Sequence, residues 1–325
     1  HRLMTDGEIL EKLGPEMVRR FKVVQHDATA SEDMVDIGTV KAGDYEIPAH
    51  VNRYALASDL LVGVGNIVPH CDAGYAGGAK ILQPGVCDFV TTSATHAAAG
   101  FCPDIPLGVA DGNPCREGIE EVARIAGLAF IVNIVKNYRG EIAGVFSGDF
   151  IKAHREGIKL AEKSFSITVP EPADIVIVSS WPSDMDYWQA TKGVSCAYFA
   201  VKKGGIIIFA APCGEGLAHN HPLFREWLSL PLNEALRRLR AASPEDVEAD
   251  TVSAVLAICN CRARDKARIF SITEGLSRED IAAMGYTPFP TVQEALDKAL
   301  ELIPDATIGI IPMGGISLPI IGRSQ

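Results

Sequence analysis

The chain has 325 residues, of which 47% are apolar and 22% are charged, and this length exceeds what one hydrophobic core usually fills, so we expect two domains. Its formal net charge of -11, without any cluster of Lys and Arg, argues against a nucleic-acid partner. No signal peptide is recognisable, and no apolar run approaches the roughly 20 residues that span a bilayer, so we expect a cytoplasmic protein without membrane contact.

The first half of the chain predicts alternating strands and helices. Thr5-Asp-Gly-Glu8 has the form of a capping box and begins a short helix that Gly14-Pro15 ends. The apolar run Leu60-Leu-Val62 leads into glycines, as a buried parallel strand does where it ends in a loop. Strands are expected at 21–24, 35–40, 45–51, 57–64, 130–135 and 141–146, and helices at 87–100, 116–127 and 150–163.

Val169-Pro-Glu-Pro172 predicts a linker, after which the alternation restarts. Strands are expected at 175–178, 205–210, 268–272 and 306–311, and helices at 189–203, within 223–241 and 244–259, and at 292–302. This alternation indicates an α/β fold with two domains, each with a largely parallel sheet flanked by helices. We assign residues 1–168, completed by 312–325, to an N-terminal domain that tethers a cofactor, and 169–311 to a C-terminal doubly wound domain.

Ligands of open α/β sheets bind beyond the carboxyl ends of the strands, so the informative loops follow Val64, Val178 and Ala210. With two such domains, we expect the active site in the cleft between them.

The loop after Val64 holds the densest set of reactive residues: His70, three glycines at 74, 77 and 78, Lys80, and then His96 on a predicted helix. Glycines let the backbone approach a ligand closely, and their N–H groups can hold an anion. Lys80 could bind a phosphate or form a covalent bond. The loop lacks the Gly-Lys-Ser/Thr of a Walker A motif, and the chain lacks the Gly-x-Gly-x-x-Gly turn of a nicotinamide dehydrogenase. On these residues alone, a plain turn between sheet and helix fits equally well.

Three separated motifs resemble the lactate racemase family. The run from His70 through Ala73-Gly-Tyr-Ala-Gly-Gly-Ala-Lys80 to His96 is similar to the family's loop and helix. His1-Arg-Leu-Met-Thr5 resembles its His-Arg-Pro-Met-Thr motif, and Tyr187-Trp-Gln-Ala-Thr-Lys192 resembles its Tyr-Gln-x-x-Lys segment. The resemblance covers essentially the whole chain, but the family's segment before the His1 motif, which supplies an arginine for the substrate carboxylate, is missing.

The resemblance implies a racemase or epimerase of 2-hydroxy acids that uses a nickel-pincer nucleotide, a mononucleotide derived from nicotinic acid and made by separate maturation enzymes. It implies a thioamide bond between the cofactor and Lys80, next to Gly77 and Gly78, and a nickel bond to His96. His1 and His70 correspond to the family's two proton-transfer bases. The substrate-binding positions correspond to Trp188, Gln189 and Lys192.

Two positions depart from the family pattern. Trp188 stands where the family has a tyrosine, so a hydroxyl contact to the substrate is lost, and Ala79 stands where an arginine often precedes the lysine. These departures and the missing segment motivate a second hypothesis, in which the chain is a catalytically inactive α/β homologue with a ligand-binding or regulatory role.

The residue types suit the implied chemistry. Removing hydride from the carbon that bears the hydroxyl gives a planar keto acid, which can be attacked from either face, and only a cofactor can accept the hydride. Histidine can take the hydroxyl proton because its pKa lies near neutral pH. Two histidines on opposite sides would serve the two enantiomers, and a third, neutral at its coordinating nitrogen, suits nickel.

The remaining polar residues have simpler interpretations. His26, His50 and His154 are expected to be structural, and the eight scattered cysteines to be reduced thiols without a zinc site. The His219-Asn-His221 loop either lines the cleft or forms a plain turn, and Asp184 and Asp186 are expected to cap the helix after them. The sequence leaves open which 2-hydroxy acid is used, and the oligomeric state.

Overall fold

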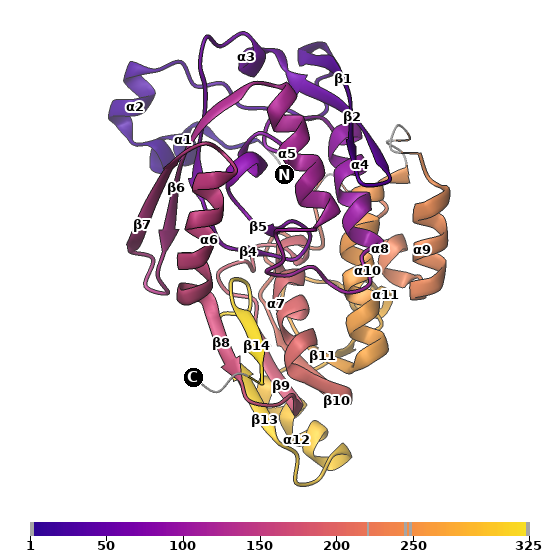
Figure 1. Cartoon of the computed structure of the whole chain (residues 1–325). Coiled ribbons are helices and arrows are strands. Elements are labelled where there is room, and N and C mark those ends of the chain that lie inside the picture. Colours follow the sequence, from indigo (N-terminus) through magenta and orange to yellow (C-terminus); the bar gives the residue numbers. More distant parts are fainter. Residues whose placement is uncertain (1–2, 220, 244–245, 247–248, 323–325) are drawn as a thin grey trace.

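The computed structural model describes residues 3–219, 221–243, 246 and 249–322. In Figure 1 the N-terminal half, indigo to magenta, lies above the sheet of the C-terminal half, which ends in the yellow strands. All eight cysteines are free, as expected.

The N-terminal half is built around a small sheet and a hairpin. Strand β3 (Leu61–Asn66) pairs in parallel with β6 (Leu128–Lys136), which pairs antiparallel with β7 (Ile142–Gly148). Helix α6 (Lys152–Phe165) packs on β6 and β7, and the hairpin β1 (Met34–Ala42) and β2 (Tyr45–Asn52) packs against α4 (Phe89–Gly100) and α5 (Pro114–Ile125). The shorter elements are α1 (Asp6–Leu13), α2 (Pro15–Arg20), η1 (Ser31–Asp33), α3 (Arg53–Leu56), β4 (Pro69–His70), β5 (Gly74–Tyr75) and η2 (Gly78–Ile81).

The C-terminal half contains a five-stranded, wholly parallel sheet in the order β12-β11-β10-β9-β13. Its strands are β9 (Ala173–Ser179), β10 (Val201–Ala210), β11 (Arg268–Ile272), β12 (Thr287–Pro288) and β13 (Ile308–Ile311). Its helices are α7 (Tyr187–Ala200), α8 (Phe224–Ser229), α9 (Leu232–Ala241), α10 (Thr251–Lys266), α11 (Arg278–Ala283) and α12 (Val292–Leu302).

Both faces of this sheet are covered, which explains its continuous apolar strands. Val176 and Phe209 belong to the main core with α7 and α10, whereas Ile175 and Ile208 pack with Ala295 of α12 on the other face. Side chains of a strand alternate between faces, so two covered faces require apolar residues at every position.

The last strand of the chain returns to the end of the N-terminal half. Strand β14 (Leu318–Ile321) pairs in parallel with β8 (Ser166–Val169), and Figure 1 shows the two side by side between the halves. Leu318 packs with Ile67 and Tyr75 in a core of the N-terminal half, while the main core runs through both halves. The domain assignment, including that of 312–325 to the N-terminal domain and the division at residue 168, stays a prediction.

The expected α/β fold with parallel sheets flanked by helices is confirmed, and several element bounds differ. Residues 21–24 are not a strand, because this apolar run finds no partner strand among the described residues. The helix expected at 189–203 ends at Ala200, and β10 begins at Val201. Gly204, whose φ is +83°, lies within this strand, where its pairing with β9 is irregular. The helix expected within 244–259 is α10, which begins at Thr251 and ends at Lys266.

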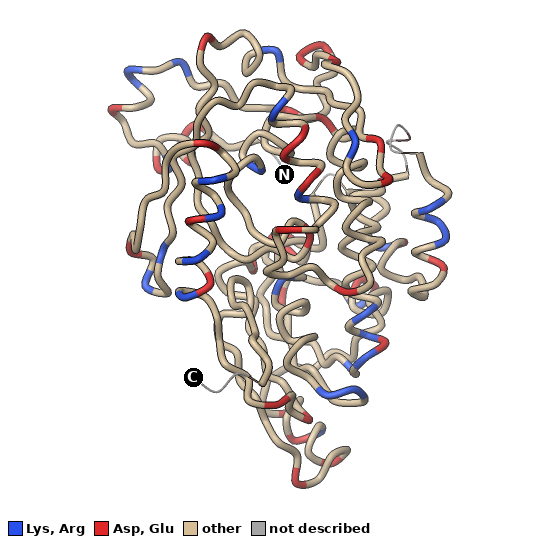
Figure 2. The backbone as a smooth tube through the Cα atoms, viewed as in Figure 1, with Lys and Arg blue, Asp and Glu red and all other residues tan. Residues whose placement is uncertain are grey.

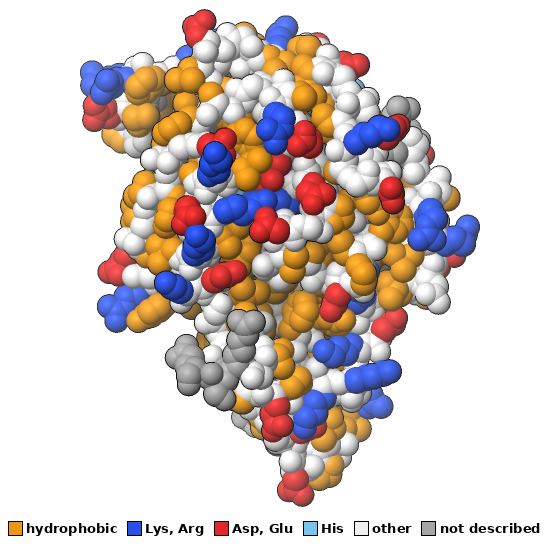
Figure 3. Space-filling model, viewed as in Figure 1, with side chains coloured by type: hydrophobic (Ala, Val, Ile, Leu, Met, Phe, Trp, Pro, Cys, Tyr) orange, Lys and Arg blue, Asp and Glu red, His pale blue; other side chains and the backbone are white. Residues whose placement is uncertain are grey.

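The charged residues agree with the sequence analysis. Figure 2 shows Lys and Arg interspersed with Asp and Glu along the chain, and Figure 3 shows the same mixture on one face of the surface. No helix in the described ranges combines the length and the apolarity that crossing a membrane requires.

Candidate functional site

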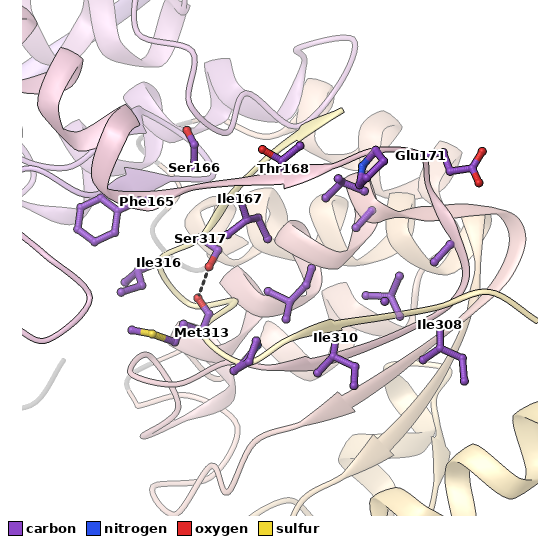
Figure 4. A pocket seen from close by; sticks show the side chains of 18 of the residues that line it. Phe165, Ser166, Ile167, Thr168, Glu171, Ile308, Ile310, Met313, Ile316 and Ser317 are labelled. Atoms are coloured by element: carbon purple, nitrogen blue, oxygen red, sulfur yellow. Dashed lines mark hydrogen bonds between the residues drawn. The ribbon is translucent and has the colours of Figure 1, made fainter. Parts of the chain in front are cut away.

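Two large cavities lie near the junction of the halves, and only one carries reactive groups. The first, of about 690 Å³, lies between the β8–β14 pair and strand β13. Figure 4 shows its apolar wall, with Ile167 on one side and Ile308 and Ile310 on the other. Glu171 is the single acidic or basic residue in its described lining, so this cavity lacks the set of groups that joint acid-base and covalent chemistry requires.

The second cavity, of about 730 Å³, is enclosed by both halves of the chain. The N-terminal half contributes His70 and Lys80 from the segment after β3, and His96 from α4. The C-terminal half contributes Trp188, Gln189 and Lys192 from α7, and His221 from the loop after β10. The segments that follow β3, β9 and β10 therefore meet at this cavity, as the rule for carboxyl ends of parallel strands predicts.

The buried Arg116 of α5 fixes the shape of the loop that carries Lys80. Its guanidinium donates hydrogen bonds to the carbonyl oxygens of Ala73 (3.1 Å), Gly77 (3.3 Å) and Tyr75. Burial lowers the pKa of Arg116 to about 10, which leaves it charged at neutral pH. One cation thus holds the carbonyl groups of three alternate residues and sets the direction of the chain toward Lys80.

Gly77 and Gly78 shape the same loop from the opposite side to the cavity. Both adopt positive φ, +76° and +60°, and neither lines the cavity. The N–H of Gly78 donates to Oδ1 of Asn133 at 2.7 Å, and a Cβ on Gly78 would lie 2.8 Å from Cγ of His154. The structure thus explains these glycines by packing, and their expected contact with a cofactor stays a prediction.

Lys80 is the amine that the loop presents to the cavity. Its Nζ has no hydrogen-bond or ion-pair partner among the residues that the structure describes. Burial lowers the pKa of Lys80, while the nearby Cys115 and Asp72 oppose this shift. An amine with a lowered pKa is more often unprotonated and therefore a better nucleophile.

His96 presents one nitrogen to the cavity. Its Nδ1 lies 2.9 Å from the carbonyl oxygen of Thr92, so Nδ1 carries the proton and donates it, which leaves Nε2 as a lone-pair donor. Burial, reinforced by Lys80, lowers the pKa of His96 to about 3, and the imidazole is neutral at neutral pH. A neutral imidazole of fixed tautomer is the form that binds a transition metal.

His70 is held in the opposite tautomer. The backbone N–H of Asp72 donates to its Nδ1 at 3.2 Å, so the proton of the neutral ring lies on Nε2. Burial, together with Lys80 and Lys192, lowers the pKa of His70 well below its usual value. In this tautomer Nε2 can donate a hydrogen bond, and it can accept a proton only after the ring proton has moved to Nδ1, which lies 3.8 Å from Oδ2 of Asp72.

Asp72 is a site residue that the sequence analysis missed. It is 2% exposed and lines the cavity, and its Oδ1 has no hydrogen-bond partner among the described residues. Burial raises its pKa, and Lys80 and Lys192 oppose the rise. His70, Cys71 and Asp72 also place three donor atoms within 4.8 Å of one another, a grouping able to hold a metal ion. In the sequence, Asp72 could have been found from the run His70-Cys71-Asp72, three possible metal ligands in a row just before the glycines.

Helix α7 brings the C-terminal residues to the cavity. Asp186 caps it by accepting a hydrogen bond from the N–H of Gln189 at 2.8 Å, the capping role expected from the sequence. Trp188 and Lys192 are four positions apart and share one face of the helix. Lys192 donates to Oε1 of Gln189 at 2.6 Å, and burial lowers the pKa of Lys192.

The other histidines are distributed as the sequence suggested. His26 bonds to Cys87 and Asn52 through its two nitrogens, His50 to Asp88, and His154 to Ala76 and Arg155. These three make structural hydrogen bonds, and His26 also lines the cavity together with His221. His1, the expected first base, lies outside the described residues. The chemical roles of all these residues stay predictions.

Two family models match separate parts of the chain. The model described as lactate racemase N-terminal domain matches residues 1–105, and the model described as lactate racemase C-terminal domain matches residues 168–320. A lactate racemase from Thermoanaerobacterium thermosaccharolyticum is 32% identical over 97% of this chain and 73% of its own length. A lactate racemase from Lactiplantibacillus plantarum is 33% identical over 68% of this chain and 53% of its own length.

Solved structures agree with these sequence matches. The lactate racemase apoprotein from Thermoanaerobacterium thermosaccharolyticum superimposes with a TM-score of 0.87 at 30% identity, covering 98% of this chain and 76% of that one. A protein from Thermotoga maritima superimposes with a TM-score of 0.74 at 20% identity, over 99% of this chain and 83% of its own, and supports the fold alone.

Proposed function

Because this chain belongs to the lactate racemase family, we propose that it is an isomerase that inverts carbon 2 of a lactate-like 2-hydroxy acid. The observation that carries the proposal is the convergence of His70, Lys80, His96 and Lys192 on one cavity between the two halves. A plain turn at the glycine loop would not require these groups to face one enclosed space.

The cofactor that the family resemblance implies, a nickel-pincer nucleotide, fits the groups that line this cavity. Lys80 offers for attachment an amine of lowered pKa that has no partner among the described residues, and His96 offers a neutral Nε2 to nickel. A cavity of about 730 Å³ is within the range that cofactor and substrate sites occupy. When bound, the cofactor supplies the hydride acceptor that no side chain provides.

The chain's own residues bind and orient the substrate and move its proton. The ammonium group of Lys192 binds the substrate carboxylate, a charge-assisted contact worth about 1.5 to 3 kcal/mol in a buried site. Gln189, which accepts a hydrogen bond from Lys192, keeps that ammonium group aimed into the cavity. Trp188 lines the cavity beside them.

Proton transfer at the substrate hydroxyl is assigned to His70 and, by the family resemblance, to His1. In the tautomer described above, the single ring proton of His70 lies on Nε2, so this proton must move to Nδ1, the side near Asp72, before Nε2 can accept the hydroxyl proton. The imidazolium formed in this way returns the proton from Nε2 to the keto oxygen when the hydroxyl re-forms. The cytoplasmic location and the need for maturation enzymes are further parts of this proposal.

Coexpression with the cofactor-making enzymes tests the proposal. We expect a mass increment on the peptide that contains Lys80, absent in Lys80→Arg, and bound nickel that is lost in His96→Ala but kept in His219→Ala. Interconversion of the two enantiomers of a 2-hydroxy acid by the loaded chain would exclude the inactive homologue. A loaded preparation with neither the increment nor nickel would overturn the proposal.

A further inference from the structure

His221 stands in the wall of the reactive cavity, and the mechanism above does not use it. Its ring stacks on that of Trp188, with centroids 3.7 Å apart and an angle of 16° between the planes. The ring of Phe89 makes a second aromatic contact with it, with centroids 5.9 Å apart and an angle of 70° between the planes. These two aromatic contacts restrict the orientation of the imidazole.

Asp250 fixes the remaining freedom of this ring. Its Oδ1 lies 3.0 Å from Nδ1 of His221, and the side chains of His221 and Asp250 are only 10% and 7% exposed. Oδ2 of Asp250 accepts a hydrogen bond from the hydroxyl of Ser253 at 2.6 Å. The indole N–H of Trp227 holds the preceding carbonyl, that of Ala249, at 3.0 Å.

The backbone of Asp250 supports a functional interpretation of this pair. Its φ is +46°, a left-handed conformation that residues other than glycine adopt uncommonly. Such conformations persist where the surroundings hold them, and they concentrate at ligand sites. Here the conformation directs the carboxylate toward His221 at the start of α10.

These contacts leave one polar atom of His221 for a ligand. Nδ1 is engaged by Asp250, and among the described residues Nε2 has no hydrogen-bond partner. The stacked Trp188 lies one helical turn before Lys192 on the same face of α7. The imidazole thus adjoins the residues proposed to hold the substrate carboxylate.

We propose that His221, held by Asp250 and Trp188, is a specificity-determining residue that hydrogen-bonds through Nε2 to a polar group on the third carbon of the substrate. This inference rests on the proposed function. The substrate class is a 2-hydroxy acid with a hydroxyl or carboxylate at that carbon, since the neutral ring accepts from a hydroxyl and the protonated ring donates to a carboxylate.

Lactate would leave this site unfilled, because its third carbon is a methyl group. A site built to hydrogen-bond a polar group rejects the analogue that lacks the group, since its own polar atom is then buried without a partner. Trp188 offers no hydroxyl at the position where the family resemblance places a tyrosine, and His221 supplies a polar atom beside it.

Calorimetric titration of the full chain, expressed with the cofactor-making enzymes, tests the inference with three acids: lactate, glycerate and malate. We expect glycerate or malate to bind at least about tenfold more tightly than lactate, the value of one net hydrogen bond. His221→Phe should remove this preference by weakening the favoured acid and leaving lactate unchanged. Asp250→Asn tolerates the left-handed backbone and should reduce the preference.

The matched control is His219→Phe, which changes the same residue type in the same loop at an exposed position outside the cavity lining. It should keep the preference. Equal affinities for the three acids, or a preference that survives in His221→Phe, would overturn the role of His221 while leaving the proposed function intact. If no acid binds, and Lys192→Ala behaves as the parent chain, the proposed function itself fails.

Discussion

Arg116 lies fully buried beneath the loop that carries Lys80, and three carbonyl groups of that loop depend on it. Arg116→Met would leave these acceptors buried without donors, and each such group costs about 1 to 3 kcal/mol. We therefore expect the free energy of unfolding, measured by urea denaturation, to fall by at least about 2 kcal/mol.

The control for this loss is Arg124→Met on the same helix. Arg124 makes an exposed ion pair with Glu121, and such pairs contribute at most about 1 kcal/mol. Equal losses of stability in the two variants would mean that the loop holds its shape without the guanidinium.

His154, packed against Gly78, links stability to pH. Burial, reinforced by Arg116, lowers its pKa to about 3 from the ordinary 6.5. Between these values the unfolded chain binds a proton that the folded chain does not, so stability falls as pH falls below 6.5. By pH 5 this one group removes about 2 kcal/mol.

The variant His154→Gln should therefore lose less stability than the parent chain between pH 7 and pH 5, even if it starts lower at pH 7. Urea denaturation at both pH values measures this difference. His219→Gln, at an exposed position, should follow the parent chain. Parallel losses in His154→Gln and the parent would contradict the neutral, buried form of His154.

At the level of elements, the turn η2 depends on the close contact between Gly78 and His154. A left-handed backbone costs a residue with a Cβ about 1 to 2 kcal/mol, and a Cβ 2.8 Å from the imidazole adds strain of about 1 to 3 kcal/mol. Gly78→Ala should thus lower the unfolding free energy by about 2 to 5 kcal/mol.

Gly140→Ala separates the two contributions to this cost. Its φ is +81°, yet nothing lies within 4 Å of the Cβ position, so only the backbone cost of about 1 to 2 kcal/mol applies. A loss in Gly78→Ala no larger than in Gly140→Ala would show that His154 moves aside.

The sequence predicted those elements in which the order of apolar and polar residues directly reflects which side chains are buried. The apolar runs of β9 and β10 and the capped helix α12 could be found because each strand or helix repeats one pattern over most of its length. Residues 21–24 have an equally apolar pattern but are exposed and unpaired, since pairing depends on a partner strand that no local pattern reveals.

The site could be predicted in part for the same physical reason. His70, Lys80 and His96 lie close in sequence within motifs, and their convergence with Lys192 followed from the rule for the ends of parallel strands. Asp250 could not be predicted as the partner of His221, because it lies 29 positions later and only the folded chain brings the two side chains together.

At the level of the whole molecule, the two halves share one continuous core and are joined through the β8–β14 pair. The polypeptide crosses into the C-terminal half after β8, and β14 brings it back. The cavity is lined by Lys80 of one half and Lys192 of the other, so its shape depends on how the two halves are held together. We therefore expect the pairing of β14 with β8 to influence this cavity, although neither strand lines it.

Leu318 tests this view because it belongs to β14 but is 7% exposed in a core of the N-terminal half. Leu318→Ala should lower the unfolding free energy by about 2 to 5 kcal/mol, the cost of emptying a buried leucine site. Hydrogen exchange should quicken in peptides that contain Ile67, Val135 and Ile158, which are remote in sequence but pack with it.

Ile310→Ala is the matched control, since Ile310 lies on the edge strand β13 and is 68% exposed. Its loss of stability should stay within about 0.5 kcal/mol, as for ordinary surface changes, with exchange in the N-terminal half unaltered. If Leu318→Ala accelerated exchange only within β14 and β8, the returning strand would be an appendage. Acceleration at Ile67, which directly follows the strand β3 and precedes the loop of His70 and Lys80, would instead tie the end of the chain to the cavity that Lys80 lines.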